Sequence, residues 1–179
     1  LYLRIAPELF LKRCLVGGID RVFEINRDFR NEGVDATHAP EFTMVEAYQA
    51  YGNYDTIGAL VKQLVQDTAM DVFGSHKVTL LDGTEYDFGG EWKTISMYDS
   101  LSEALGEEIV PNGGPDNPGT SVEHLGEIAD KLGVERDDVE NHGKLVEHLW
   151  EHFYEDKLYE PTFVRDFPVE TSPLVKAHR

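Results

Sequence analysis

RVFEINRDFRNEG, at residues 21–33, and PEFTMVEAYQAY, at residues 40–51, are the two stretches that decide the fold. In the first, the apolar residues Phe23, Ile25 and Phe29 share one parity and polar residues take the other, which predicts a β-strand over residues 21–29. The second predicts another strand, over residues 42–51. The polar segment between them contains a glycine and a proline, which favour turns. We therefore expect an antiparallel hairpin with a long loop.

One face of this hairpin collects groups that suit a nucleotide. Arg30 ends the first strand, and its planar guanidinium can hold a phosphate or a carboxylate through two parallel hydrogen bonds. Glu32 can accept a hydrogen bond from an exocyclic amine such as that of adenine, and Phe42 can stack on a purine ring. His38 lies in the loop, where it can meet the outer phosphates. Any one of these residues alone is more often part of a surface ion pair, so the interpretation depends on their occurring together.

Two more polar side chains are expected on the same face, because Glu46 and Tyr48 have the parity of Phe42 along their strand. A carboxylate and a phenol on one wall suit an ammonium ligand, since one supplies charge and the other a hydrogen-bond acceptor.

The same residues resemble a known motif. FRNEG at residues 29–33, the loop with His38, and PEFTMVEAY at residues 40–48 look like motif 2 of the class II aminoacyl-tRNA synthetases, in the form found in lysyl-tRNA synthetases. LYLRIAPEL at residues 1–9 also resembles that family, whereas the relatives for aspartate and asparagine share only the Phe-Arg and Glu-Phe cores. The resemblance implies an α+β fold on an antiparallel sheet of the class II synthetase type. The chain would be part of its catalytic domain.

For ATP, the resemblance implies one role for each residue. Arg30 would hold the α-phosphate, and Glu32 would accept a hydrogen bond from the adenine amine. His38 would contact the outer phosphates, and Phe42 would stack on adenine. Ala39 departs from the family, which often has Asn after the loop histidine, so a hydrogen bond from that side chain is lost.

For L-lysine, the resemblance implies that Glu8 binds the α-ammonium and Arg30 the carboxylate, while Glu46 and Tyr48 help to form the side-chain pocket. The implied reaction has two steps. The lysine carboxylate attacks the α-phosphorus of ATP to give lysyl-adenylate and pyrophosphate, and the 3′ end of tRNA(Lys) then takes the lysyl group. Neither step needs a covalent enzyme intermediate, so positioning and charge neutralisation supply the catalysis.

Other parts of such an enzyme are missing from the sequence: the glycine-rich motif 3, the carboxylates that hold Mg²⁺, most of motif 1 and the anticodon-binding barrel. We therefore expect a segment of a longer polypeptide, inactive by itself and without metal ligands of its own. Its parent would be cytoplasmic and, as in the family, a homodimer. The single cysteine, Cys14, excludes an internal disulfide and fits a reducing compartment. No apolar run approaches the roughly 20 residues that cross a bilayer, so no membrane partner is expected.

Two alternatives remain open. A paralogue can make the same adenylate and attach lysine to elongation factor P, and the sequence upstream would distinguish it. A non-catalytic paralogue can bind amino acid or tRNA as a regulator, although an unused ATP site should lose its residues through drift.

The rest of the chain predicts a helix over residues 55–73, a hairpin around Asp82-Gly83 and then a helical insertion at about residues 96–160. Helices are expected at 96–105, 121–133 and 143–158, with a loop at 111–119, followed by a strand at 163–167. HLWEH at residues 148–152 matches a zinc-protease pattern. At ~100° per residue its histidines fall on the charged flank of the helix, so we expect a solvated face.

The net charge of −18 is uneven, because residues 1–54 carry eight acidic and six basic side chains and residues 55–179 carry 26 and ten. So acidic a surface repels phosphate backbones. We therefore expect the main contacts with tRNA to lie elsewhere in the parent protein.

Overall fold

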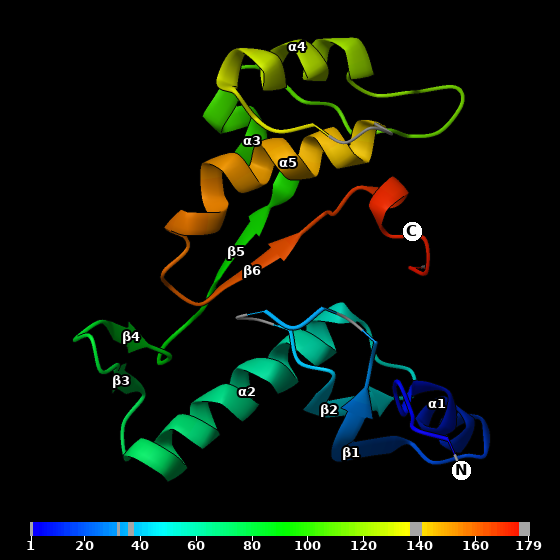
Figure 1. The fold of residues 1–179 in the computed structure, drawn as a ribbon, viewed down its shortest axis with the longest axis vertical. Coiled ribbons are helices and arrows are strands. Elements are labelled where there is room, and N and C mark those ends of the chain that lie inside the picture. Colours follow the sequence, from blue (N-terminus) through cyan, green and yellow to red (C-terminus); the bar gives the residue numbers. More distant parts are fainter. Residues whose placement is uncertain (1, 32, 36–37, 137–140, 176–179) are drawn as a thin grey trace. The chain divides into compact units, whose positions relative to one another are not determined.

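A computed structural model describes residues 2–31, 33–35, 38–136 and 141–175 (Figure 1). The chain divides into two compact units, Leu1–Ala59 and Leu60–Arg179. Helix α2 (Tyr54–Phe73) runs across the division. Both units combine helices with strands, so the predicted α+β class is confirmed.

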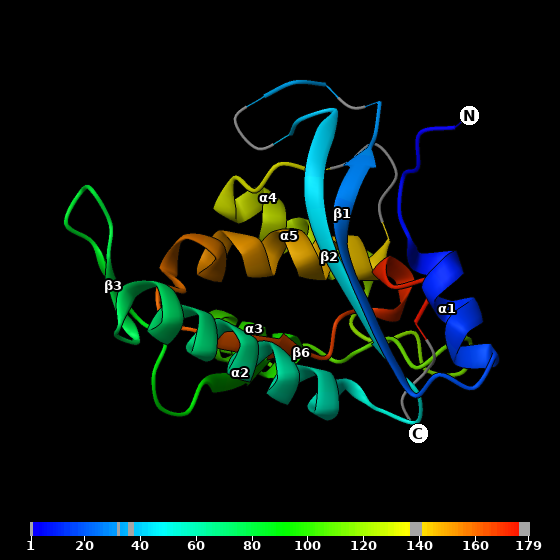
Figure 2. The same cartoon turned by 90° about the horizontal axis from the view of Figure 1, so that it is seen from below.

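The first unit is the predicted hairpin with one helix packed against it. Strands β1 (Arg21–Phe29) and β2 (Glu41–Gln49) are antiparallel, with Phe42 opposite Asp28 and Glu46 opposite Glu24. Figure 2 shows them as a long twisted ribbon, and α1 (Glu8–Val16) contacts both strands. The expected end of the second strand at Tyr51 is wrong by two residues, because the chain turns there with a positive φ of 59°.

The side chains on the two faces of the hairpin differ in exposure, and the difference is the reverse of the one expected. On the polar face, Glu46 and Tyr48 are half-buried. On the other face, the apolar side chains of Phe23, Ile25 and Val45 are 69%, 64% and 52% exposed. The predicted alternation is therefore correct, but within the described residues it is the polar face that is covered.

The second unit contains the remaining strands. Among the described residues, β3 (Lys77–Thr79) and β4 (Glu85–Asp87) form the hairpin expected around Gly83, whereas β5 (Lys93–Ser96) and β6 (Thr162–Arg165) pair in parallel. The expectation of purely antiparallel strands is therefore wrong for this pair. The strand predicted at 163–167 ends at Arg165, because Asp166 has a positive φ of 61°.

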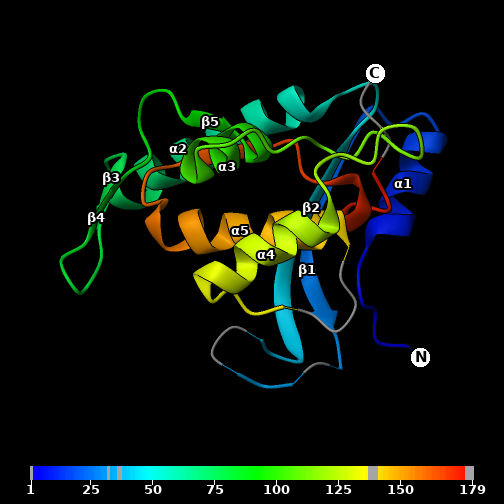
Figure 3. The ribbon, with the colours of Figure 1, turned by 90° about the horizontal axis from the view of Figure 1, so that it is seen from above.

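The chain between β5 and β6 is helical, with α3 (Met97–Leu105), α4 (Val122–Leu132), α5 (His142–Tyr154) and the 3₁₀ helix η1 (Glu155–Lys157). Figure 3 shows α4 lying along α5, and both α3 and α4 contact α5. Their apolar faces form the core of this unit, which includes Met97, Leu101, Leu125, Leu145, Val146 and Leu149. A second 3₁₀ helix, η2 (Val169–Thr171), follows β6 and also contacts α5.

Capping residues explain where these helices begin and end. The side chains of Ser96, Ser121 and Asn141 each accept a hydrogen bond from a backbone N–H in the first turn of the helix that follows. Gly106 and Gly133 end α3 and α4 in the left-handed conformation that glycine adopts most easily. No helix in the described part of the chain is both long and apolar enough to span a membrane.

Candidate functional site

Arg30 and Phe42 converge at the loop end of the hairpin. The backbone N–H of Arg30 donates to the carbonyl of Pro40 at 2.9 Å, which extends the strand pairing one residue beyond β1. The guanidinium carbon then lies 5.3 Å from the centroid of the Phe42 ring, a cation–π distance. The two side chains predicted to hold the phosphate and the purine therefore face the same space.

The guanidinium of Arg30 is also tied to the chain before α1. Its Nε donates to the carbonyl of Ile5 at 3.3 Å, across 25 residues of sequence. Among the described residues this hydrogen bond engages Nε, and the two terminal nitrogens form the fork that can meet a phosphate or a carboxylate.

The second part of the polar face is a pair on β2. The Tyr48 hydroxyl donates to Oε2 of Glu46 at 2.6 Å, a length typical of a hydrogen bond to a charged oxygen. Burial raises the pKa of the Tyr48 phenol far above its ordinary value, and the hydrogen bond to Glu46 and the charges of Glu46 and Glu8 add to this. The phenol therefore stays protonated and keeps the Glu46 carboxylate in place.

Glu8 reaches the same cluster from the first turn of α1. Its carboxylate forms an ion pair with Lys12, one helical turn later. The Lys12 ammonium also lies 5.7 Å from the centroid of the Tyr48 ring. An ammonium already lies between Glu8 and Tyr48, so the chemistry of this corner suits a cationic amine.

The loop carries the two remaining predicted residues. The backbone N–H of His38 donates to Oδ1 of Asp35 at 2.8 Å, and its Nδ1 lies 2.9 Å from both oxygens of that carboxylate. His38 is therefore positioned by Asp35, which the sequence interpretation had not singled out. Glu32 lies outside the described residues, so its predicted contact with adenine stays a prediction.

The family of the chain follows from comparison with known proteins. A family model described as tRNA synthetases class II (D, K and N) matches residues 1–179. This chain belongs to the class II tRNA synthetases.

Individual relatives of this synthetase chain share one name. The lysine–tRNA ligase of Kineococcus radiotolerans is 65% identical over 180 residues, and that of Mycolicibacterium gilvum is 61% identical over 181; both alignments cover 100% of this chain. The lysine–tRNA ligase of Syntrophomonas wolfei is 44% identical over 176 residues, 98% of this chain. The chain spans only 34–35% of the length of these relatives.

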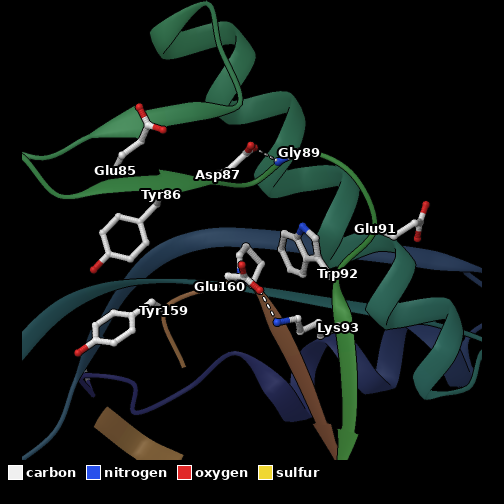
Figure 4. A pocket seen from close by; sticks show the side chains of 10 residues that line it. Glu85, Tyr86, Asp87, Gly89, Glu91, Trp92, Lys93, Tyr159 and Glu160 are labelled. Carbon is white, nitrogen blue, oxygen red and sulfur yellow. Dashed lines mark hydrogen bonds and ion pairs between the residues drawn. The ribbon is translucent and has the colours of Figure 1, made fainter. Parts of the chain in front are cut away.

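Outside the hairpin, the second unit of this synthetase chain has an acidic and aromatic hollow of about 360 Å³, lined in part by Tyr86, Trp92 and Tyr159 (Figure 4). Its carboxylates already have cationic partners. Figure 4 shows the ion pair of Lys93 with Glu160, whose charged atoms lie 2.5 Å apart. We therefore assign no ligand to this hollow.

The HLWEH pattern lies on another surface of the second unit. Both of its histidines, His148 and His152, line a shallow hollow with Glu151 and Glu155. Within the described ranges, no group of three or more His, Cys, Asp or Glu side chains is arranged to hold a metal ion. The pattern therefore gives no support to zinc chemistry.

Proposed function

We propose that the protein to which this chain belongs activates L-lysine with ATP to form lysyl-adenylate and transfers the lysyl group to tRNA(Lys). The observation that carries this proposal is the polar face of the hairpin. Arg30 lies over Phe42 at one end, and Tyr48 holds Glu46 at the other. The names of the relatives favour this activity over elongation factor P modification and over a regulatory role.

In this proposal the nucleotide lies at the loop end of the hairpin. The adenine ring takes the face of Phe42 that the Arg30 guanidinium now covers, and the guanidinium turns its two terminal nitrogens to the α-phosphate. There it neutralises the charge that develops as the lysine carboxylate attacks. Glu32 accepts a hydrogen bond from the adenine amine, and His38 contacts the outer phosphates.

Lysine lies along the same face. Glu8 binds its α-ammonium, Arg30 its carboxylate, and Glu46 with Tyr48 its side-chain ammonium. Such an arrangement holds the attacking carboxylate close to the α-phosphorus, and this proximity lowers the barrier without covalent catalysis.

Magnesium is expected to accompany ATP. Following the family resemblance, the proposal places the ligands of the ion outside this segment and takes the segment alone to be inactive. It also takes the helical stretch at about 96–160 to be an insertion in the catalytic domain, and the parent to be a cytoplasmic homodimer.

Arg30→Ala in the full-length protein tests the proposal. We expect lysine-dependent pyrophosphate exchange to fall by on the order of 10²-fold or more, the effect of losing one donor to the transition state. Arg30→Lys should recover little of it, because an ammonium cannot replace a bidentate fork.

Arg27→Ala is the matched control, because Arg27 lies on the opposite face of the same strand, where its exposed side chain forms a 3.5 Å ion pair with Glu41. It should leave the exchange rate nearly unchanged. A near-normal rate in Arg30→Ala would contradict the assignment.

A further inference from the structure

The residues before α1 lie against the end of β1, directly beside the candidate site. The N–H of Phe29 donates to the carbonyl of Arg4 at 2.8 Å, and Nε of Arg30 donates to the carbonyl of Ile5 at 3.3 Å. Pro7, two residues after Ile5, is the N-cap of α1, whose first residue is Glu8. One short segment is therefore connected to both Arg30 and Glu8.

The side chain of Arg4 fastens this segment to β1 at three points. Its Nη1 lies 2.7 Å from Oε1 of Glu24, and its Nε lies 3.1 Å from Oδ1 of Asp28. The same Nε donates to the carbonyl of Arg27 at 3.1 Å. Hydrogen bonds from Asn26 and Arg4 lower the pKa of Glu24, so this carboxylate stays charged in the cluster.

Asp28 is the unusual member of the cluster. Its side chain is only 1% exposed, and it lies opposite Phe42 in the hairpin and two residues before Arg30. Neither of its oxygens has a hydrogen bond of good geometry within the described residues, so the nearby Arg4 guanidinium is its charge partner there. Nη2 of Arg4 is likewise buried without such a bond.

This pair is a poor way to stabilise a fold. Removing the Asp28 carboxylate from water is costly, and the attraction of Arg4, whose side chain stays 28% exposed, compensates only when hydrogen bonds satisfy the remaining buried atoms. Here three buried atoms of Arg4 and Asp28 lack them. What the pair does achieve is geometric, because it fixes where the Ile5 carbonyl lies with respect to Arg30.

We propose that Arg4 and Asp28 are positioning residues of the adenylate-forming site. Their ion pair holds the segment of residues 4–6 on β1, and this segment orients the Arg30 guanidinium through the Ile5 carbonyl and sets the start of α1 that carries Glu8. The expected kinetic effect rests on the proposed function, whereas the positioning of Arg30 and Glu8 does not.

Asp28→Asn is the first test, because it removes the charge and changes the volume little. In the full-length protein we expect kcat for adenylate formation, per active site titrated, to fall about ten- to a hundredfold, since small displacements of a reacting group have effects of this size. The KM for ATP should change by less than threefold. A purely structural role would lower the number of active sites and leave kcat per site unchanged.

Arg4→Gln in the same background completes a double-mutant cycle. If the pair acts as a unit, the double variant should be no slower than the slower single variant, because it leaves no unpaired charge in the interior. Arg4→Lys is a milder second variant in case Asp28→Asn folds poorly, and it should lose part of kcat. Arg27→Gln is the matched control, because it breaks the exposed pair with Glu41 on the opposite face and should leave kcat unchanged.

A crystal structure of the Asp28→Asn protein gives a readout that does not depend on activity. We expect the hydrogen bond between Nε of Arg30 and the Ile5 carbonyl to be lost. If the unaltered protein shows no lysine-dependent exchange, the proposed function fails, and this structure still decides the positioning role. An Asp28→Asn protein with kcat within twofold of the unaltered protein, or with Arg30 unmoved, overturns the inference.

Discussion

Tyr48→Phe should weaken the binding of lysine specifically, because it removes the hydroxyl that holds the Glu46 carboxylate. That hydrogen bond is 2.6 Å long, within the range of O–H donors on charged oxygens. Hydrogen bonds to charged groups contribute about 1.5–3 kcal/mol. At 1.4 kcal/mol for each factor of ten, we expect the KM for lysine to rise about ten- to a hundredfold.

The assay is lysine-dependent pyrophosphate exchange by the full-length protein, with lysine varied at saturating ATP and then ATP varied at saturating lysine. The KM for ATP should stay within twofold, because Tyr48 has no part in the nucleotide end of the site. Tyr51→Phe is the control, since that side chain is fully exposed just beyond β2.

Glu46→Gln shows whether Tyr48 acts through its neighbour. This variant should raise the KM for lysine by at least as much as Tyr48→Phe, because it removes the charge that we propose attracts the ammonium. Adding Tyr48→Phe to Glu46→Gln should then have little further effect. Two results would refute the reasoning. One is a KM for lysine within twofold of normal in Tyr48→Phe. The other is a double variant whose rise in the KM for lysine equals the product of the rises in the two single variants.

Two further predictions concern the second unit. Burial lowers the pKa of His142, so the folded protein takes up this proton at a lower pH than the unfolded chain. Thermal stability should therefore fall as the pH drops below about 6.5. The variant His142→Leu should show a smaller fall over the same pH range. Gly119→Ala should lower the free energy of unfolding by about 1 kcal/mol or more, because φ is +76° and the new Cβ would lie 2.6 Å from the Val110 carbonyl oxygen. Gly106→Ala should lower the free energy of unfolding by less, because Gly106 has a similar φ of +73° but open space around it. Denaturant unfolding of both variants measures the difference.

The hairpin was predictable because parity determines the face of every residue once the two strands pair. Alternation alone placed Arg30, Phe42, Glu46 and Tyr48 on one side, and the observed register agrees. The ends of the strands were less certain. Glu41 is polar and carried no strand signal, although it pairs with Phe29.

The parallel pair of β5 and β6 could not have been predicted in the same way. It joins Thr94 to Phe163 across the whole helical stretch, and no local pattern specifies a partner so distant in sequence. The four residues of β5 also run directly into α3, where Ser96 is both the last strand residue and the helix cap. The helix start was therefore predicted, whereas the strand before it was missed.

Asp28 shows a second limit of the sequence interpretation. Alternation places it on the polar face, which suggests a solvated carboxylate. It is nevertheless buried, because the segment around Arg4 covers it. The sequence contains both residues but gives no signal that they meet. Asp28 on its strand and Arg4 before α1 would have the same sequence pattern whether they formed a pair or were each solvated.

The inverted exposure of the hairpin bears on how the site would work. Burying polar groups is costly unless they have partners, and several side chains of this face have them: Arg4 pairs with Glu24, Tyr48 with Glu46 and Lys12 with Glu8. Asp28 differs, because its buried oxygens have the charge of Arg4 beside them but no hydrogen bond within the described residues. These contacts fix the charges before any ligand arrives, which is the condition for electrostatic catalysis without reorganisation. If Glu8 binds the α-ammonium of lysine as proposed, that ammonium must share the carboxylate with Lys12. Selectivity in this corner would then depend on exchange between two cations of the same chemistry, and not on the filling of an empty pocket.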